Sequence, residues 1–245
     1  MIMEIKELYA SMSEKEILKG LNMRINDGEF HVLMGPNGSG KTTLSKAIMG
    51  YPKLKITGGE ILVDGKSILN LTTDERAKLG IFLQFQNPME IEGVGFVNFL
   101  HSANSAVNGN HADVKEFMSE VRGMNEKLKL SGNIFKKPLN HGFSGGEKKK
   151  AEVIQMSVLK PKFAILDEPD SGLDIDAIKT VAENVNEIAQ RNNTSILLIT
   201  HYSRILNYMK PQFVHVMIEG RIVAEGGIEL IKKLEAEGYE SFMHK

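Results

Sequence analysis

A glycine-rich stretch, GPNGSGKT from Gly35 to Thr42, restricts the possible folds of this 245-residue chain more than any other segment. It overlaps the end of the apolar run FHVLMG (30–35), which is typical of a short buried strand. It precedes a segment in which Leu44, Ala47 and Ile48 recur at helical spacing. A strand, this loop and a helix in that order are the context that a phosphate-binding loop requires. The sequence therefore predicts a nucleotide-binding core of the α/β class.

The residue types in this loop suit phosphate chemistry. Its glycines allow backbone N–H groups to wrap the α- and β-phosphates. Lys41 is long enough to reach the β- and γ-phosphates, and the Thr42 hydroxyl is a suitable ligand for Mg²⁺. We therefore expect the nucleotide-binding residues to be Gly35, Pro36, Asn37, Gly38, Ser39, Gly40, Lys41, Thr42 and Thr43.

Two further apolar runs end in residues that could act on a bound triphosphate. FAILDE (163–168) ends in an acidic pair, in which we expect Asp167 to hold Mg²⁺ through its water shell and Glu168 to polarise the attacking water. SILLITH (195–201) ends in His201. An acidic pair is otherwise a helix cap or part of a solvated loop, and a lone histidine is usually structural. Because a phosphate loop is also predicted, these purely structural interpretations of the acidic pair and of the histidine are less favoured.

The rest of the chain alternates short apolar runs with helical patterns, which indicates α/β layering around a mainly parallel sheet. The segment 175–190 has apolar residues at helical spacing and is expected to cover one sheet face as ordinary core packing. FVHVMIEGRIVAEGG predicts a hairpin that turns at Glu219 and Gly220, and IELIKKLEAEG predicts a last helix.

The middle of the chain has a different pattern. Between about Asn87 and Asn140 there are few β-branched runs, so we expect a helical subdomain there. An amphipathic helix is predicted from Val114, Phe117, Val121, Met124 and Leu128. The polar segment NSAVNGNHAD (104–113) is expected to be its surface loop.

Charge and composition exclude several classes of function. Thirty basic residues stand against thirty-one acidic ones, so no global field draws the protein to nucleic acid or to an anionic membrane. The chain has no cysteine, hence no disulfide and no thiolate metal site of its own. The start MIMEIKELYA lacks the pattern of a signal peptide, and no stretch approaches the roughly 20 apolar residues of a membrane helix. We expect a cytoplasmic protein without direct membrane insertion.

Six segments occur together in the order and spacing of ATP-binding-cassette (ABC) ATPases, and the chain resembles that family. They are GPNGSGKT, Gln86 in FQNP, FSGGE (143–147), ILDEP with Asp167 and Glu168, SGLD (171–174) and His201. The resemblance implies a single domain over residues 1–245. Residues 1–86 and 141–245 would together form a RecA-like phosphate-loop core of mainly parallel strands and an antiparallel β subdomain on the N-terminal side. A helical subdomain would be inserted at about 87–140.

The resemblance also implies roles for individual residues. Glu168, His201 and Gln86 would be catalytic, and Thr42, Gln86 and Asp167 would hold Mg²⁺. Two ATP molecules would be held between two cassettes in a transient head-to-tail dimer. Each ATP would meet the partner's signature loop, which here consists of Ser144, Gly145, Gly146 and Glu147. The D-loop would be Ser171, Gly172, Leu173 and Asp174.

The signature loop accounts for an unusual run of charge. EKKK (147–150) places cations at a helix start, where the helix dipole is already positive, and an anion bound there in trans would be attracted by both. The roles of Lys148, Lys149 and Lys150 stay ambiguous, because a charge run is usually a solvated surface. We expect at least one of them to lie near the nucleotide or the water site of Glu168.

Within this family the chain is most similar to the SufC type, the ATPase of the Suf iron-sulfur cluster assembly system. The segments that carry this likeness include FQNPMEIEGV, GFSGGEKKKAEVIQM and DEPDSGLDIDAIK. Transport cassettes usually have a glutamine- and arginine-rich sequence after the signature loop and threonine where this chain has Asp170. The likeness implies SufB/SufD-like scaffold subunits as partners. The alternatives are a subunit of a membrane ABC transporter, or a nucleotide-gated switch that hardly turns ATP over, against which Glu168 and His201 count.

Adenine recognition departs from the family pattern. Many transport cassettes stack the base on an aromatic residue after the first strand, whereas the matching position here is assigned to Met12, with Tyr9 three residues earlier. A thioether can pack on a ring face, so we expect the base to be bound with weaker selectivity.

Overall fold

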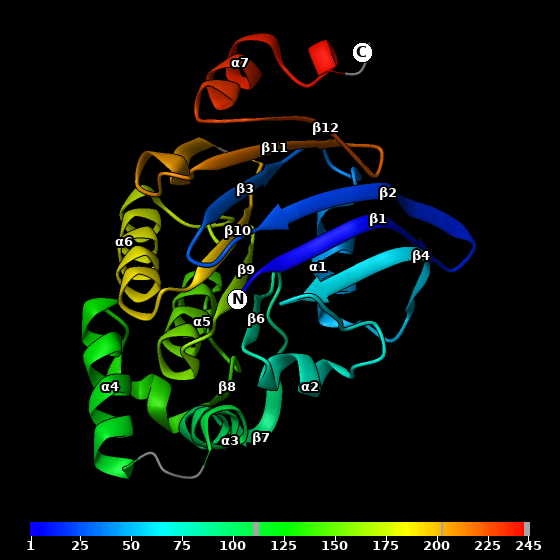
Figure 1. Ribbon diagram of the computed structural model, residues 1–245. Coiled ribbons are helices and arrows are strands. Elements are labelled where there is room, and N and C mark those ends of the chain that lie inside the picture. Colours follow the sequence, from blue (N-terminus) through cyan, green and yellow to red (C-terminus); the bar gives the residue numbers. More distant parts are fainter. Residues whose placement is uncertain (110–112, 202, 243–245) are drawn as a thin grey trace.

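The computed structural model describes residues 1–109, 113–201 and 203–242 of the chain. A six-stranded sheet in the order β12-β11-β3-β10-β9-β6 forms its centre (Figure 1). Its strands are β3 (Phe30–Met34), β6 (Ile81–Gln84), β9 (Phe163–Asp167), β10 (Ser195–Ile199), β11 (Phe213–Ile218) and β12 (Arg221–Gly226). All neighbours pair in parallel except β12, which is antiparallel to β11. The expected α/β fold and the three predicted strands at 30–35, 163–168 and 195–201 are confirmed.

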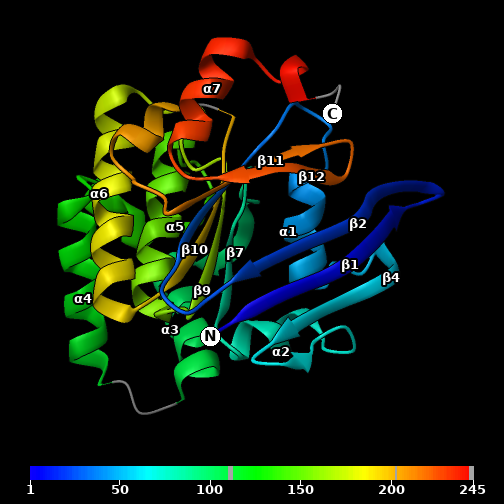
Figure 2. The ribbon, with the colours of Figure 1, turned by 45° about the horizontal axis from the view of Figure 1, so that its top comes forward.

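A second sheet, antiparallel throughout, has the order β2-β1-β4-β5. It consists of β1 (Met3–Met12), β2 (Lys15–Ile25), β4 (Leu54–Val63) and β5 (Lys66–Ser67). Helix α1 (Lys41–Met49) lies between the two sheets (Figures 1 and 2). The short helix α2 (Thr73–Lys78) follows this sheet in the chain. The antiparallel β subdomain expected on the N-terminal side is therefore present.

The central strands bury both faces, and alternate residues face different cores. On β3 and β10, Leu33 and Leu197 belong to the apolar cluster shared with α1 and the antiparallel sheet. Their neighbours Val32 and Leu198 belong to the cluster on the opposite face. That face is covered by α5 (Gly145–Leu159) and α6 (Ile175–Asn192) (Figure 1). The continuous apolar runs follow from this, because a parallel strand covered on both sides has no solvent face.

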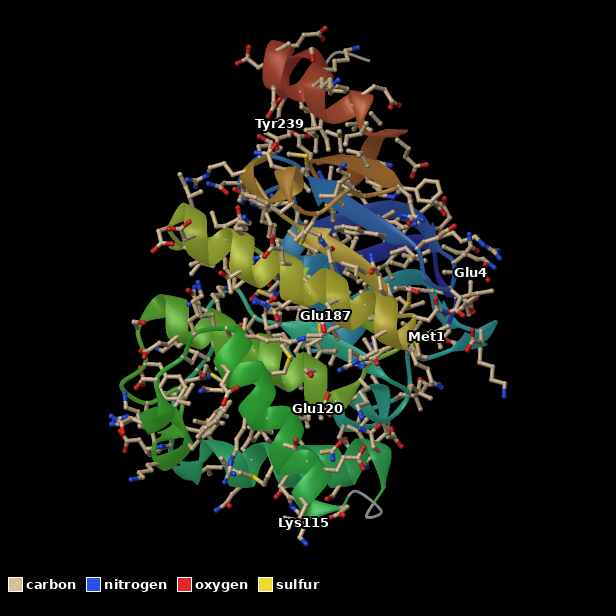
Figure 3. All side chains as sticks on the ribbon, turned by 90° about the vertical axis from the view of Figure 1, so that its left-hand side faces the viewer. Met1, Glu4, Lys115, Glu120, Glu187 and Tyr239 are labelled. Atoms are coloured by element: carbon tan, nitrogen blue, oxygen red, sulfur yellow. The ribbon has the colours of Figure 1, made fainter. Side chains whose placement is uncertain are left out.

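A helical insertion lies below α5 and α6 (Figure 1). It contains α3 (Phe96–Asn108), α4 (Val114–Lys127) and the 3₁₀ helix η1 (Gly132–Lys136), and it is closed by the antiparallel pair of β7 (Ile91–Gly95) and β8 (Pro138–Leu139). Glu120 of α4 ties it to the core helices by accepting hydrogen bonds from Ser157 of α5 (2.9 Å) and Arg191 of α6 (3.0 Å) (Figure 3). The boundaries at 87 and 140 stay a prediction.

Two details of the sequence interpretation of this insertion are wrong. The expected surface loop at 104–113 is helical up to Asn108, because Asn104 is buried (6% exposed) and accepts a 2.7 Å hydrogen bond from the Asn108 amide. Residues 110–112 of that segment lie outside the described part. In α4 the apolar face starts at Phe117, since Val114 at the helix start is 59% exposed.

The C-terminal part follows the prediction. β11 and β12 form a hairpin whose central residues, Glu219 and Gly220, have φ values of 47° and 83°. Two positive φ angles define the turn type that suits the twist of a two-residue hairpin. η2 (Ser203–Asn207) precedes the hairpin, and α7 (Glu229–Glu237) and η3 (Glu240–Phe242) follow it. Among the described residues, no helix combines the length and apolarity needed to cross a bilayer.

Candidate active site

An open cleft of about 640 Å³ lies beyond the carboxyl ends of β3, β9 and β10, where a parallel sheet places its ligands. Its lining joins segments that are far apart in the sequence. The lining residues are Lys15, Glu16, Ile17, Lys19, Asn37, Gly38, Gly40, Lys41, Thr42, Thr43, Gln86, Glu168, His201 and Glu219. The structure therefore brings the phosphate loop, the acidic strand end, Gln86 and His201 to one place.

The phosphate loop is closed around the Lys41 ammonium. Lys41 Nζ donates to the carbonyl oxygens of Gly35 (2.7 Å) and Pro36 (2.9 Å) and lies 3.5 Å from Ser39 Oγ. Burial lowers the pKa of Lys41 to about 8, against the opposing charges of Glu168 and Asp167. The helix α1 starts directly at Lys41, after Gly40 at φ 110°, so its free N–H groups face the loop. An anion can therefore be bound by the helix start and the lysine together.

Residues suited to a divalent cation lie beside this loop. Asp167 is 2% exposed, and its Oδ2 lies 3.4 Å from Ser45 Oγ. Burial raises the pKa of Asp167, whereas the nearby Thr42 side chain favours the charged form of the carboxylate and so acts to lower its pKa. Asp167 Oδ1 is buried and has no hydrogen-bond partner among the described residues. An unpartnered carboxylate oxygen next to a threonine hydroxyl is a donor set that fits Mg²⁺.

Glu168 is held between two of the predicted catalytic residues. Its Oε1 lies 2.7 Å from His201 Nε2, and its Oε2 accepts a 2.7 Å hydrogen bond from Gln86 Nε2. The Glu168 backbone has φ 51°, a conformation that costs free energy for a residue other than glycine. The Glu168 N–H donates to the Ile199 carbonyl (2.8 Å), which fixes the turn against β10. The carboxylate is thereby aimed into the cleft.

The signature loop is placed away from the cleft of its own chain, since none of residues 144–147 is among the described lining residues. Ser144 caps α5 by accepting from the Glu147 N–H (3.2 Å), and the Glu147 carboxylate accepts from the Ser144 N–H (2.8 Å). That capping box lowers the pKa of Glu147. A Cβ on Gly146 would lie 3.4 Å from Leu173 of the predicted D-loop, so the two loops adjoin. Asp174 caps α6.

The assignment of the adenine contact to Met12 stays a prediction. Met12 ends β1 and is not among the described residues that line the cleft, whose wall on this side is formed by Lys15, Glu16, Ile17 and Lys19 of β2. In the antiparallel register Met12 pairs with Lys15, which does line the cleft. These β2 residues form no recognisable motif, so the sequence held no signal for them.

Sequence reasoning also left two residues on this side of the sheet without a structural role. Asp170 is 1% exposed and accepts a 3.1 Å hydrogen bond from Thr200, so it joins the loop after β9 to the end of β10. Lys149 is 3% exposed, unlike Lys148, whose ammonium pairs with Glu90 at 2.8 Å on the surface. A run of three lysines gives no indication of which one is buried.

The sheet, the loop and the cleft define a phosphate-loop nucleotide-binding protein. A profile of the family described as "ABC transporter" matches residues 18–171. The chain is 50% identical over 238 residues to vegetative protein 296 of Bacillus subtilis, covering 96% of this chain and 91% of that protein. It is 49% identical over 243 residues to the probable ATP-dependent transporter ycf16 of Cyanophora paradoxa, covering 98% and 93%. The chain belongs to the ABC transporter family and is an ATP-hydrolysing cassette.

Solved structures agree with this assignment. A nucleotide-free ATP-binding cassette from an ABC transporter is similar with a TM-score of 0.77 and 26% identity, over 96% of this chain and 95% of that one. The ADP conformation of another transporter cassette has the same TM-score of 0.77 and 26% identity, over 100% and 99% of the two chains. Both likenesses extend over nearly the whole chain, so the fold is that of an ATP-binding cassette.

Proposed function

We propose that this chain is the cytoplasmic ATPase subunit of a Suf-type iron-sulfur cluster assembly scaffold, and that it hydrolyses ATP between two copies of itself. The observation that supports the catalytic part is the position of Glu168 in the cleft, hydrogen-bonded by Gln86 and His201 at 2.7 Å each. The assembly role rests on the sequence likeness in EKKKAEV and at Asp170.

In this mechanism Lys41 and the N–H groups at the start of α1 bind the phosphates of ATP. When phosphate replaces the carbonyls of Gly35 and Pro36 as the partner of Lys41, the negative charge keeps the lysine protonated. Mg²⁺ would be held by Thr42, Gln86 and Asp167. When bound, the ion would neutralise part of the negative charge of the phosphates. Glu168 accepts a proton from the water that attacks the γ-phosphorus, and ADP leaves with the bridging oxygen.

Gln86 and His201 orient the Glu168 carboxylate in this step. Each of them contacts a different oxygen of Glu168, so the two contacts together fix the orientation of the carboxylate. His201 follows β10 and Gln86 follows β6, which are the strands on either side of β9. A shift of either loop would therefore turn the carboxylate away from the water.

The second copy is required because the site of one chain is incomplete. The capping box uses the N–H groups of Ser144 and Glu147, whereas Gly145 and Gly146 stand in the first turn of α5, where N–H groups have no partner within the helix. None of these residues is among the described residues that line the cleft of their own chain. A second cassette in head-to-tail orientation would present this helix start to the γ-phosphate. ATP would then bridge the two copies, and its hydrolysis would release them.

The catalytic role is tested by Glu168→Gln. The amide keeps the size of the side chain but cannot accept the proton, so we expect turnover to fall about 10²- to 10⁴-fold. The affinity for ATP should stay within about twofold, because Lys41 and the phosphate loop are unchanged. Steady-state phosphate release and equilibrium binding of a fluorescent ATP analogue measure the two quantities. Unchanged turnover would remove Glu168 from the role of base.

The assembly role is tested by isolating the native complex from a detergent-free extract and assaying it for iron and sulfide. The chain has no cysteine, so thiols that hold a cluster must come from partner subunits. A cysteine-bearing SufB/SufD-like partner that carries iron and sulfide would support the proposal. Recovery only with detergent, together with a multi-span membrane protein, would contradict it.

A transporter subunit is the second candidate. The relative from Cyanophora paradoxa is named a probable ATP-dependent transporter, and relatives from Streptococcus pyogenes that are 48% identical are named probable ABC transporter ATP-binding proteins. This alternative leaves the ATPase reaction unchanged and differs only in the partner. The same isolation experiment decides between the two.

A further inference from the structure

Two charged residues of α5, Lys149 and Glu152, are buried about one turn beyond the signature loop. Each is only 3% exposed. They are three positions apart, so both side chains lie on one face of the helix. A buried charge is costly unless it is paired and hydrogen-bonded. Neither residue lines the nucleotide cleft as far as the structure describes it, so the reason for their burial lies elsewhere.

Both residues bind the backbone of the segment that follows β6. Lys149 Nζ donates to the carbonyl oxygens of Phe85 and Gln86, each at 2.8 Å. Glu152 Oε1 accepts from the Phe85 N–H, also at 2.8 Å. Three hydrogen bonds with these two side chains therefore hold two consecutive residues against α5. The two from the Lys149 ammonium are charge-assisted, a kind of bond about twice as strong as one between neutral groups. Burial raises the pKa of Glu152 to about 8, and its Oε1 accepts the Phe85 N–H.

Apolar packing offers no comparable anchor at this point. The Phe85 side chain is 56% exposed, and Met89, four residues further, is 78% exposed. Gln86 nevertheless has to be placed accurately, because its amide donates the 2.7 Å hydrogen bond to Glu168. The position of the Gln86 side chain thus depends on the polar contacts of its own backbone.

We propose that Lys149 and Glu152 are positioning residues for ATP hydrolysis, which clamp the Phe85–Gln86 backbone to the signature-loop helix and thereby hold Gln86 against Glu168. This inference rests on the proposed roles of Gln86 and Glu168. Its consequence is a direct mechanical link. When the start of α5 meets ATP bound by a second copy, any shift of α5 carries Gln86 with it. One cassette thus sets the carboxylate geometry in its own cleft according to what its signature loop has bound.

The first experiment compares Lys149→Met with Gln86→Ala and with the double variant. Lys149→Met removes the ammonium group that donates both hydrogen bonds, and it keeps the approximate length and the apolar stem of the side chain. We expect kcat to fall about 10- to 100-fold, since misplacement of a catalytic contact by about 1 Å has effects of this size. KM for ATP should change by less than about twofold, because no phosphate-loop contact is altered. Lys179→Met, at an exposed lysine of α6, is the control for loss of a positive charge on a helix.

The double variant separates positioning from mere stabilisation. If Lys149 acts through Gln86, Lys149→Met adds nothing once Gln86 is alanine, and the double variant is as slow as Gln86→Ala alone. Two effects that multiply would overturn the inference. A kcat for Lys149→Met equal to that of the wild type would overturn it as well. Thermal unfolding of each variant checks that the fold is retained, and Lys149→Gln replaces Lys149→Met if the latter does not fold.

Glu152 provides an independent variant pair. Glu152→Gln keeps an oxygen that can accept the Phe85 N–H, whereas Glu152→Leu leaves that N–H without its partner. We expect the glutamine variant to be at least about 10-fold faster in kcat than the leucine variant. Equal rates would contradict the clamp. If Gln86→Ala and Glu168→Gln themselves hydrolyse ATP like the wild type, the proposed catalytic roles fail. If they are slow and the Lys149 and Glu152 variants are not, only the clamp fails.

Discussion

At the scale of single residues, three half-buried polar side chains meet at the cleft. Gln86, Glu168 and His201 are separated in the sequence, yet 2.7 Å contacts join them at the cleft. The sequence predicts Glu168 and His201 from their places at strand ends, and the resemblance to the family adds Gln86. Their mutual hydrogen bonds could not be predicted, because they depend on the order of β6, β9 and β10 in the sheet.

A pair of buried histidines lies away from the cleft. His31 of β3 and His215 of β11 are 2% and 5% exposed, and their ring nitrogens Nδ1 and Nε2 lie 2.8 Å apart. Glu29 contacts His31 at 3.0 Å and Glu225 contacts His215 at 3.1 Å. Burial lowers the pKa of both histidines, and the carboxylates oppose this only in part. The pair is therefore favoured in its uncharged form in the native state.

This pair predicts acid sensitivity of the fold. Because the native pKa of each histidine lies below the unfolded value of about 6.5, the unfolded chain binds more protons as the pH falls through that value. The contribution to stability is present above about pH 6.5 and is lost below it. We expect the free energy of unfolding to fall between about pH 7 and pH 5 more steeply in the wild type than in the His31→Gln/His215→Gln variant. Urea unfolding at several pH values measures both slopes, and equal slopes would contradict the prediction.

At the scale of elements, the phosphate loop is held by a hairpin that lies far from it in the sequence. The Gly220 N–H, in the turn between β11 and β12, donates to the Ser39 carbonyl (2.8 Å). The Gly220 carbonyl accepts from the Lys19 N–H of β2 (3.0 Å). The sequence predicts the hairpin turn itself from its residues. Its contact with the phosphate loop is tertiary and had no sequence signal.

Gly220→Ala tests this contact. The residue has φ 83°, and a Cβ there would lie 2.0 Å from the Ile17 carbonyl oxygen, so the turn has to move. We expect a loss of about 3 kcal/mol or more in the free energy of unfolding, together with weaker ATP binding. Gly65→Ala is the matched control, with φ 78° and no atom within 4 Å of the added carbon, and it should cost only about 1 kcal/mol. Denaturant unfolding and ATP titration give both values. Similar losses for the two variants would show that the contact with Ile17 is unimportant.

The end of α3 illustrates why element boundaries are harder to predict than elements. Polar residues from Asn104 onward suggested a loop, yet the helix continues to Asn108. Asn108 donates to Asn104 and also to the Leu159 carbonyl at the end of α5, at 3.3 Å. The last turn of α3 thus contacts another helix, and tertiary contacts of this kind override local preference.

At the scale of the whole molecule, each chain has a nucleotide cleft and a signature loop that lies outside it. This separation predicts dimerisation that depends on ATP. Glu168→Gln, which should trap the bound triphosphate, is expected to elute as a dimer with ATP and as a monomer without it. Adding Gly145→Leu should abolish the dimer while leaving ATP binding to the monomer within about twofold. Gly145 is suited to this test because a Cβ there meets no atom within 4 Å in the single chain. Size-exclusion chromatography with light scattering measures the mass, and a dimer that persists in the double variant would contradict the head-to-tail arrangement.

The sequence by itself determined the local features of this protein. The buried central strands, the phosphate loop, the acidic strand end, the hairpin turn and the start of α5 depend on periodicity and on residue types within about ten positions. The tertiary structure alone decided which distant groups meet. It buries Lys149 and leaves Lys148 at the surface, places residues of β2 along the cleft, and keeps the signature loop out of the described lining of its own cleft. The physical reason is that these contacts depend on the packing of helices and sheets against one another, which neighbouring residues in the sequence do not encode.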